Sequence, residues 1–235
     1  MMKALPTIEQ IKHNKALTAF SAVFVAIFIL LGFWQIERAG SKASLIQEFD
    51  LEQAKAPKPI SDSSLQWSRV YIEGFYDPAQ QVLIDNQIKN GKVGYKIYTP
   101  FYYKQDQAIF VDRGWIPQGK TRKDLPNVNF NATKLRIIGS LIKPEKEVLA
   151  GDELLTNEWP LVSQTKSPRV IQEAYEKKFS DMVLILDPGS LFMNEHVALI
   201  PFVITPTKHY GYALQWFTMS LVLAGMFMYA IKRES

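Results

Sequence analysis

LTAFSAVFVAIFILLGFW, from Leu17 to Trp34, is the stretch of sequence that decides the fold. It has no charged residue, and at about 1.5 Å of rise per helical residue it comes close to crossing roughly 30 Å of hydrocarbon. A second charge-free stretch, YGYALQWFTMSLVLAGMFMYAI, runs from Tyr210 to Ile231. Such long charge-free runs are uncommon in soluble proteins. The sequence therefore predicts two transmembrane helices, with two buried core helices as the less favoured alternative.

A cleaved secretory signal is another explanation of the first stretch, because Lys3, Lys12 and Lys15 precede it. The stretch is longer than a usual signal core, however, and it ends in the bulky sequence GFWQI, where a cleavage site has small residues. We therefore expect a permanent membrane anchor.

The basic residues beside the two stretches predict how the chain crosses the membrane. Lys12 and Lys15 precede the first stretch, and Lys232 and Arg233 follow the second. Because basic flanks stay in the cytoplasm, both ends of the chain are expected there. The expected segments are a cytoplasmic tail (1–16), a transmembrane helix (17–36), an extracytoplasmic domain (37–209), a second transmembrane helix (210–231) and a second cytoplasmic tail (232–235).

Composition and charge narrow the class of protein. The chain has no cysteine, which excludes disulfide bonds, thiolate metal ligands and covalently attached c-type haem. Its net charge of +4 lies partly on the tails, which favours contact with lipid headgroups over nucleic-acid binding. The first tail carries Glu9 and no arginine, unlike a mitochondrial targeting peptide. We expect a bacterial inner-membrane protein with its domain in the periplasm.

Between the two spans the hydrophobic period changes from helical to strand-like. Helical spacing over residues 39–54 predicts a short amphipathic helix near the membrane, and Ser167-Pro168 predicts another helix that ends at about Phe179. Runs rich in Val, Ile, Tyr and Phe predict strands at 68–76, 81–84, 93–103, 108–112, 134–142 and 182–186. We expect the first two strands to form a hairpin. The predicted fold class is membrane α+β, with two transmembrane helices flanking a mostly β extracytoplasmic domain that has one or two packed helices.

His209 is the first candidate functional residue, because it lies where the domain meets the second span. On a helix, His209, Tyr212, Ala213, Trp216 and Ser220 fall on one face. One interpretation is an aromatic belt, since Tyr and Trp anchor spans at headgroup level. The other is an axial ligand for haem, whose iron commonly binds a histidine nitrogen. The sequence alone leaves both open.

Two further groups of residues are candidates for binding. Trp34, Gln35 and Arg38 end the first span, and antiparallel packing of the spans would bring them beside His209. In the domain, Arg113 has a planar charge suited to a carboxylate such as a haem propionate, and Trp115 has a large flat face. The alternative for this pair is structural, with a tight turn between them and Trp115 in the core.

Four motifs occur in order along the chain, GFWQIER at 32–38, GY and TP within 94–100, VDRGWIP at 111–117 and HYGYALQWF at 209–217. They resemble the G-x-W-Q-x-x-R, G-Y…T-P, V-x-R-G-W-x-P and H-x-x-Y-A-x-x-W-F motifs of the Surfeit locus protein 1 family. The resemblance covers nearly the whole chain. It departs beside His209, where Thr207-Lys208 and Tyr210 replace the family's usual two asparagines and leucine.

The resemblance implies a non-enzymatic assembly factor for haem-copper cytochrome c oxidase that binds haem a and assists its insertion into subunit I. It implies oxidase subunit I and haem a synthase or other assembly factors as partners, in addition to the membrane lipid that the two spans and the charge predict. His209 would bind the haem iron. The other expected cofactor-binding residues are Tyr212, Trp216, Trp34, Gln35, Arg38, Arg113 and Trp115. The alternatives are a membrane scaffold that binds no haem and a membrane-anchored sensor or enzyme domain.

The predicted orientation can be tested with a reporter enzyme that is active only outside the cytoplasm. Fused after Asn157 the reporter should be active, and fused after Ser235 it should be silent, because the two basic flanks hold both ends inside. Reporter activity on intact cells is the measurement. The reverse pattern would contradict the orientation.

Overall fold

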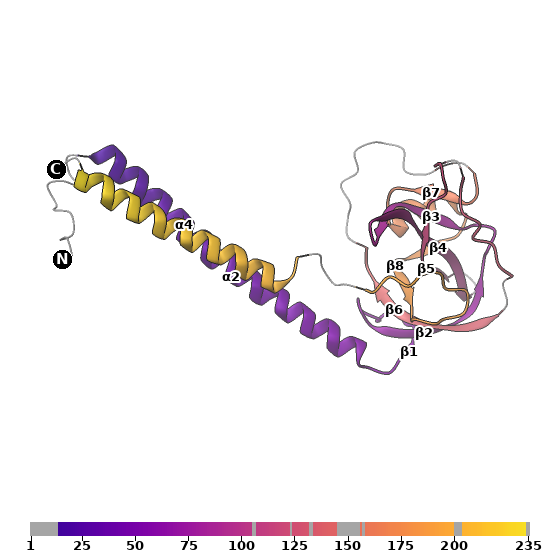
Figure 1. Cartoon of the computed structure of the whole chain (residues 1–235). Helices are drawn as coiled ribbons and strands as arrows, with labels where there is room; N and C mark the ends of the chain where they lie inside the picture. The colour runs from indigo at the N-terminus through magenta and orange to yellow at the C-terminus, as the bar shows by residue number, and fades with distance from the viewer. Residues whose placement is uncertain are drawn as a thin grey trace. The chain divides into compact units, whose positions relative to one another are not determined.

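A computed structural model describes residues 14–104, 107–122, 124–131, 134–144, 156, 158–199 and 204–233 (Figure 1). The chain divides into two compact units. We call Met1–Glu48 with Ile200–Ser235 the helix unit and Phe49–Leu199 the barrel unit. The two units are described separately below.

Two long helices make up the described part of the helix unit, α2 (Lys15–Gln53), whose last turn belongs to the barrel unit, and α4 (Pro206–Arg233). Both are long and apolar enough to cross a membrane, as predicted. The amphipathic helix expected over residues 39–54 exists, but it is the continuation of the first span and not a separate element. The reason is that no proline interrupts the chain before Pro57, so every backbone N–H after the first turn can donate within the helix.

The barrel unit is built mainly of strands. They are β1 (Lys58–Pro59), β2 (Arg69–Tyr76), β3 (Val82–Lys89), β4 (Lys92–Lys104), β5 (Gln107–Pro117), β6 (Leu135–Ile142), β7 (Leu161–Ser163) and β8 (Phe179–Leu186). The six predicted strands all exist. The short strands β1 and β7 were not predicted, because two or three residues are too few to show a period.

The sheet closes on itself, which is visible as a ring of strands in Figure 1. Strand β2 pairs with β6 on one side and with β4 on the other, so β2, β6, β8, β5 and β4 form a closed circuit. Strands β3 and β7 extend the sheet beyond β4. The expected hairpin between β2 and β3 is therefore wrong. The observed hairpin joins β3 to β4 through Asn90-Gly91, whose positive φ angles of 51° and 75° suit a tight two-residue turn.

Alternate side chains of the circuit fill the inside of the barrel. This core cluster consists of Val70, Ile72, Tyr76, Phe101, Ile109, Val111, Ile137, Leu141, Leu184 and Leu186. Gly74 allows the closure, because a Cβ there would lie 2.1 Å from the carbonyl oxygen of Tyr102 on β4. A strand residue without a side chain is what so close a backbone approach requires.

A short helical segment covers the outer face of the barrel. It consists of α3 (Pro168–Ile171) and a 3-10 turn (Gln172–Ala174), and Ile171 packs in a second core cluster. The predicted helix to Phe179 is therefore too long. The chain turns extended at Tyr175, whose ring packs against Phe110 and Phe179, so side-chain packing ends the helix early.

Candidate functional site

The two helices of the helix unit pack antiparallel along one buried stripe on each. The buried residues are Ser21, Gly32 and Ala39 on α2 and His209, Ala213, Ser220 and Ile231 on α4. The ring of Phe28 lies 5.6 Å from that of Trp216. At Gly32 an added Cβ would come within 2.5 Å of the Phe217 ring. The glycine therefore permits the close approach of the two helices at this level.

His209 and Gln35 meet across this helix pair. The Nδ1 atom of His209 lies 2.7 Å from Oε1 of Gln35, and the histidine is only 9% exposed. Because an amide oxygen only accepts hydrogen bonds, Nδ1 carries the proton and donates it. The other ring nitrogen, Nε2, is buried and has no hydrogen-bond partner among the described residues. Gln35 thus holds the ring through Nδ1 and leaves Nε2 without a hydrogen-bond partner among the described residues.

The remaining candidates of the helix unit lie outside this contact. Trp216 is partly buried beside Phe28, so it shares the stripe with His209 as expected. Tyr212 and Trp34 are 45% and 47% exposed, and the Arg38 guanidinium lies 5.7 Å from the centre of the Trp34 ring. The structure therefore joins Gln35, His209 and Trp216, and it leaves Trp34, Arg38 and Tyr212 on accessible sides of the helices.

Arg113 lies inside the barrel unit, on β5. Its Nε donates to the carbonyl oxygen of Phe192 at 2.9 Å, and its Nη1 donates to Oε1 of Gln81 at 2.7 Å. The guanidinium also stacks on the Phe130 ring at 4.1 Å from its centre. A ligand carboxylate would have to displace these contacts, because the residue is only 3% exposed.

Burial shifts the ionisation of Arg113 and its neighbour Tyr76 in opposite directions. It lowers the pKa of Arg113 to about 10, with a smaller opposing effect of Tyr76, so the guanidinium stays charged at neutral pH. It raises the pKa of the Tyr76 hydroxyl well above its usual value, although the charge of Arg113 acts against this. A charged guanidinium without a carboxylate within ion-pair distance among the described residues therefore relies on neutral acceptors.

Trp115 and Gly114 also have structural contacts. The indole Nε1 of Trp115 donates to the carbonyl oxygen of Gln87 at 2.8 Å, and its backbone N–H donates to Glu195 at 2.7 Å. Gly114 has a φ of 100°, and a Cβ there would lie 2.6 Å from the Glu195 carbonyl oxygen. This part of β5 thus binds the segment at Glu195 to the barrel.

Two motif residues on β4 support the same cluster. Gly94 packs under Trp115, because an added Cβ would lie 2.6 Å from the indole ring. Thr99 Oγ1 donates to Gln81 at 3.0 Å, and the Arg113 guanidinium donates to Thr99 at 3.4 Å. Sequence reasoning missed Gln81, which lies outside all four motifs, and no periodicity or turn signal marks it.

The described residues also bear on metal binding. Among them no group of three or more His, Cys, Asp or Glu side chains is placed to hold a metal ion. Within the helix unit, His209 Nε2 is a single buried nitrogen without a hydrogen-bond partner among the described residues.

The chain combines a barrel unit, in which five strands form a closed circuit, with a helix unit of two membrane-length helices that meet at the contact between His209 and Gln35. The chain belongs to the SURF1 family, whose model matches residues 22–221. That range includes all four motifs, the helix-pair contact and the Arg113 cluster.

Named relatives agree with this family. A SURF1-like protein of Rickettsia felis is 26% identical over 223 residues, which are 89% of this chain and 93% of that protein. Cytochrome oxidase assembly protein SHY1 of Saccharomyces cerevisiae is 25% identical over 133 residues, or 52% of this chain and 34% of that protein. Surfeit locus protein 1 of Xenopus tropicalis is 26% identical over 115 residues, or 40% of this chain and 38% of that protein.

The contacts of Arg113 generate a stability prediction. Arg113→Lys should lower the free energy of unfolding by about 2–3 kcal/mol, because one ammonium cannot replace the planar fork and leaves buried acceptors unpaired. Urea unfolding of the detergent-purified chain, followed by tryptophan fluorescence, measures this change.

Arg136→Lys is the matched control. Arg136 lies on the outside of the same barrel, bound to Glu73 with both side chains more than half exposed, so this change should alter stability little. Equal effects of the two substitutions would contradict the structural role of Arg113. Unchanged stability of Arg113→Lys together with lost oxidase assembly would assign that arginine to ligand binding.

Proposed function

We propose that this chain assists the assembly of cytochrome c oxidase by binding haem a at His209 and passing it to subunit I. The observation that carries the proposal is the orientation of the His209 ring, with Nδ1 bound to Gln35 and a buried Nε2 without a partner among the described residues. The name of the yeast relative, a cytochrome oxidase assembly protein, supports the oxidase as the target.

The residues of the helix pair suit haem. The group would supply an iron that accepts a histidine nitrogen, and His209 offers an Nε2 atom without a hydrogen-bond partner among the described residues. The hydrogen bond to Gln35 keeps the proton on the far nitrogen and fixes the plane of the ring. Exposed Trp34 and Tyr212 offer aromatic faces, and Arg38 offers a cation for a propionate.

Burial of Nε2 means that haem binding has to uncover it. The residues next to His209 on its own helix, Thr207, Lys208, Tyr210 and Gly211, are all exposed. A small displacement of the helix pair at this level would expose the lone pair. Such a site holds haem only while the pair is displaced, which suits a protein that must release its cargo.

The same burial favours a second candidate function, a scaffold for oxidase subunits that binds no haem. Large apolar side chains on both helices are exposed, including Phe20, Leu30 and Phe33 on α2, and would face lipid or helices of a partner. In either function we expect no chemical turnover, with the barrel unit on the periplasmic side of a bacterial inner membrane.

Substitution of His209 separates the two functions. In cells that make haem a, detergent-purified His209→Ala should lose the haem absorbance, because the iron loses its only protein ligand in this proposal. His196→Ala is the control, since this histidine belongs to the barrel unit and should keep the spectrum. An unchanged spectrum in His209→Ala would contradict haem binding there and leave the scaffold function ahead.

Two further variants test how the residue acts. Gln35→Leu should keep the protein in the membrane and weaken haem binding by about 10- to 100-fold, the range for loss of the partner that orients a metal-binding histidine. His209→Gly should recover the absorbance when imidazole is added, because free imidazole replaces the missing ring. Failure of both would mean that His209 acts only in helix packing.

A further inference from the structure

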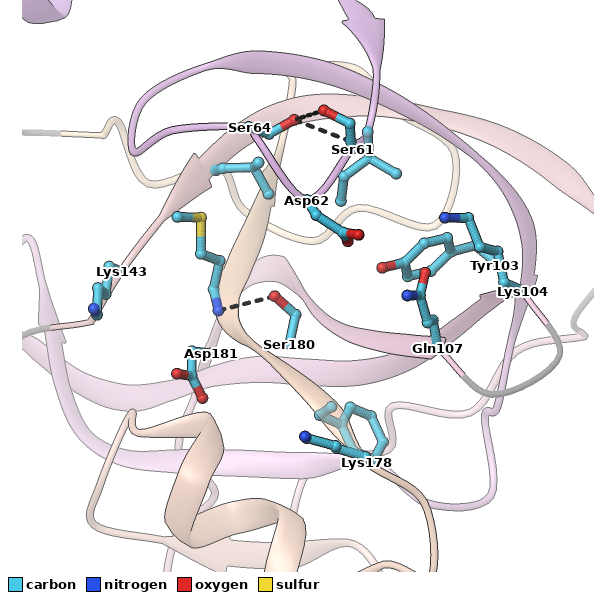
Figure 2. Close-up of a pocket in the computed structure, with 14 residues that line it drawn as sticks. Ser61, Asp62, Ser64, Tyr103, Lys104, Gln107, Lys143, Lys178, Ser180 and Asp181 are labelled. Carbon is cyan, nitrogen blue, oxygen red and sulfur yellow. Dashed lines mark hydrogen bonds between the residues drawn. The ribbon is translucent and has the colours of Figure 1, made fainter.

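A cavity of about 400 Å³ lies in the barrel unit, and Arg113 is not among its lining residues (Figure 2). Its walls come from the segment after β1, the end of β4, the start of β5, the end of β6 and the start of β8. Strands β5 and β8 run parallel, so their starts lie at the same end of the barrel. Strands β4 and β6 run antiparallel to β5 and β8, so the ends of β4 and β6 lie there too. The size is within the range of small-molecule sites.

Three lysines line this cavity. Lys104 comes from the end of β4, Lys143 follows β6 and Lys178 precedes β8, and Figure 2 shows them on different sides of the cavity. Among the described residues, none of the three ammonium groups makes a hydrogen bond or an ion pair. The cavity therefore gathers positive charge from three separate strand ends.

Two acidic residues, Asp62 and Asp181, line the cavity, and they differ in their hydrogen bonds. Asp181 is bound by Arg169, and this hydrogen bond, with smaller effects of Lys143 and Lys178, holds the pKa of the Asp181 carboxyl below its usual value. Asp62 has no such partner among the described residues. Burial and the charge of Asp62 together raise the pKa of the Tyr103 hydroxyl, so this group is a neutral donor at pH 7. Positive charge thus outweighs free negative charge.

Gln107 adds an unmet acceptor to the wall. Its Oε1 atom is buried and has no hydrogen-bond partner among the described residues. Buried polar atoms are usually paired, so an unpaired one beside a cavity favours a ligand that donates a hydrogen bond. Ser61, Ser64 and Ser180 supply hydroxyl groups around the same space.

We propose that this cavity binds a small phosphate ester, whose phosphate is attracted by the positive charge of Lys104, Lys143 and Lys178 and whose hydroxyl or amine lies toward Gln107 and Asp62. Phosphate is favoured over carboxylate, because its two negative charges suit a wall with three lysines and several hydroxyl groups, and lysine is a common phosphate binder. A phospholipid headgroup and a soluble phosphate ester share this chemistry. The site belongs to the barrel unit and is independent of haem binding in the helix unit.

Lysine acetylation of the full-length chain tests this site without any substitution. The protein in dodecyl maltoside is treated with an acetylating reagent, with or without sn-glycerol 3-phosphate, and the modified lysines are identified by mass spectrometry. Lys104, Lys143 and Lys178 should be protected about tenfold relative to Lys92, Lys120 and Lys134, which are exposed and lie outside the cavity. Equal modification of the two sets at saturating ligand overturns the proposal.

Calorimetric titration of two triple variants with the same net charge separates binding at the cavity from the general effect of protein charge on ligand binding. Changing Lys104, Lys143 and Lys178 to Gln should weaken sn-glycerol 3-phosphate binding at least about tenfold, whereas the same change at Lys92, Lys120 and Lys134 should leave it within about twofold. Gln107→Leu should weaken binding of the ester and leave binding of inorganic phosphate unchanged. Equal losses in the two triple variants overturn the proposal.

Nanodiscs identify the source of the phosphate group. Protection of the three lysines in phosphatidylglycerol nanodiscs without added ester assigns the site to a lipid headgroup. Protection only on addition of sn-glycerol 3-phosphate assigns it to a soluble ester. Lack of protection in both conditions overturns the proposal.

Discussion

The hydrogen bond between Gln35 and His209 is the polar contact that joins the two helices of the helix unit, and the proposed function depends on it. It joins two helices across 174 residues of sequence, fixes which ring nitrogen carries the proton and leaves the other nitrogen unpaired in a buried place. Gly32 makes the contact possible, because only a residue without a side chain lets Phe217 pack against α2 one turn away. The close packing at Gly32 thus allows His209 to reach Gln35 on the other helix.

The four sequence motifs fall into two groups, one in the helix unit and one in the barrel unit. The first and last motifs meet in the helix pair, through Gln35 with His209 and Gly32 with Phe217. The two central motifs meet in the barrel unit, where Thr99 supports Arg113 and Gly94 makes room for Trp115. The central motifs therefore stabilise the barrel, while the outer motifs hold His209, whose Nε2 has no hydrogen-bond partner among the described residues.

Hydrophobic periodicity predicted much of the fold, because it reports burial directly. It gave both long helices, six of the strands and the stripe that contains His209, Ala213 and Trp216. Periodicity did not predict strand pairing or the end of the short helix, because both depend on contacts between residues far apart in the sequence. Strand β2 pairs with β4 and β6, although the turn after it predicted a hairpin with β3. The packing of the Tyr175 ring against Phe110 ends the helical segment after α3 earlier than predicted. The Gln35–His209 contact was expected only as a proximity, since tautomer and burial follow from three-dimensional packing.

The most direct test of the account is the protonation state of the two nitrogens of His209. Histidine labelled with nitrogen-15, in a chain whose His13 and His196 are changed to glutamine, gives one imidazole to observe by NMR in detergent. The account predicts a protonated Nδ1 and an unprotonated Nε2, with the Nε2 signal lost or shifted when haem is added. A protonated Nε2, or a signal that haem does not change, would contradict it.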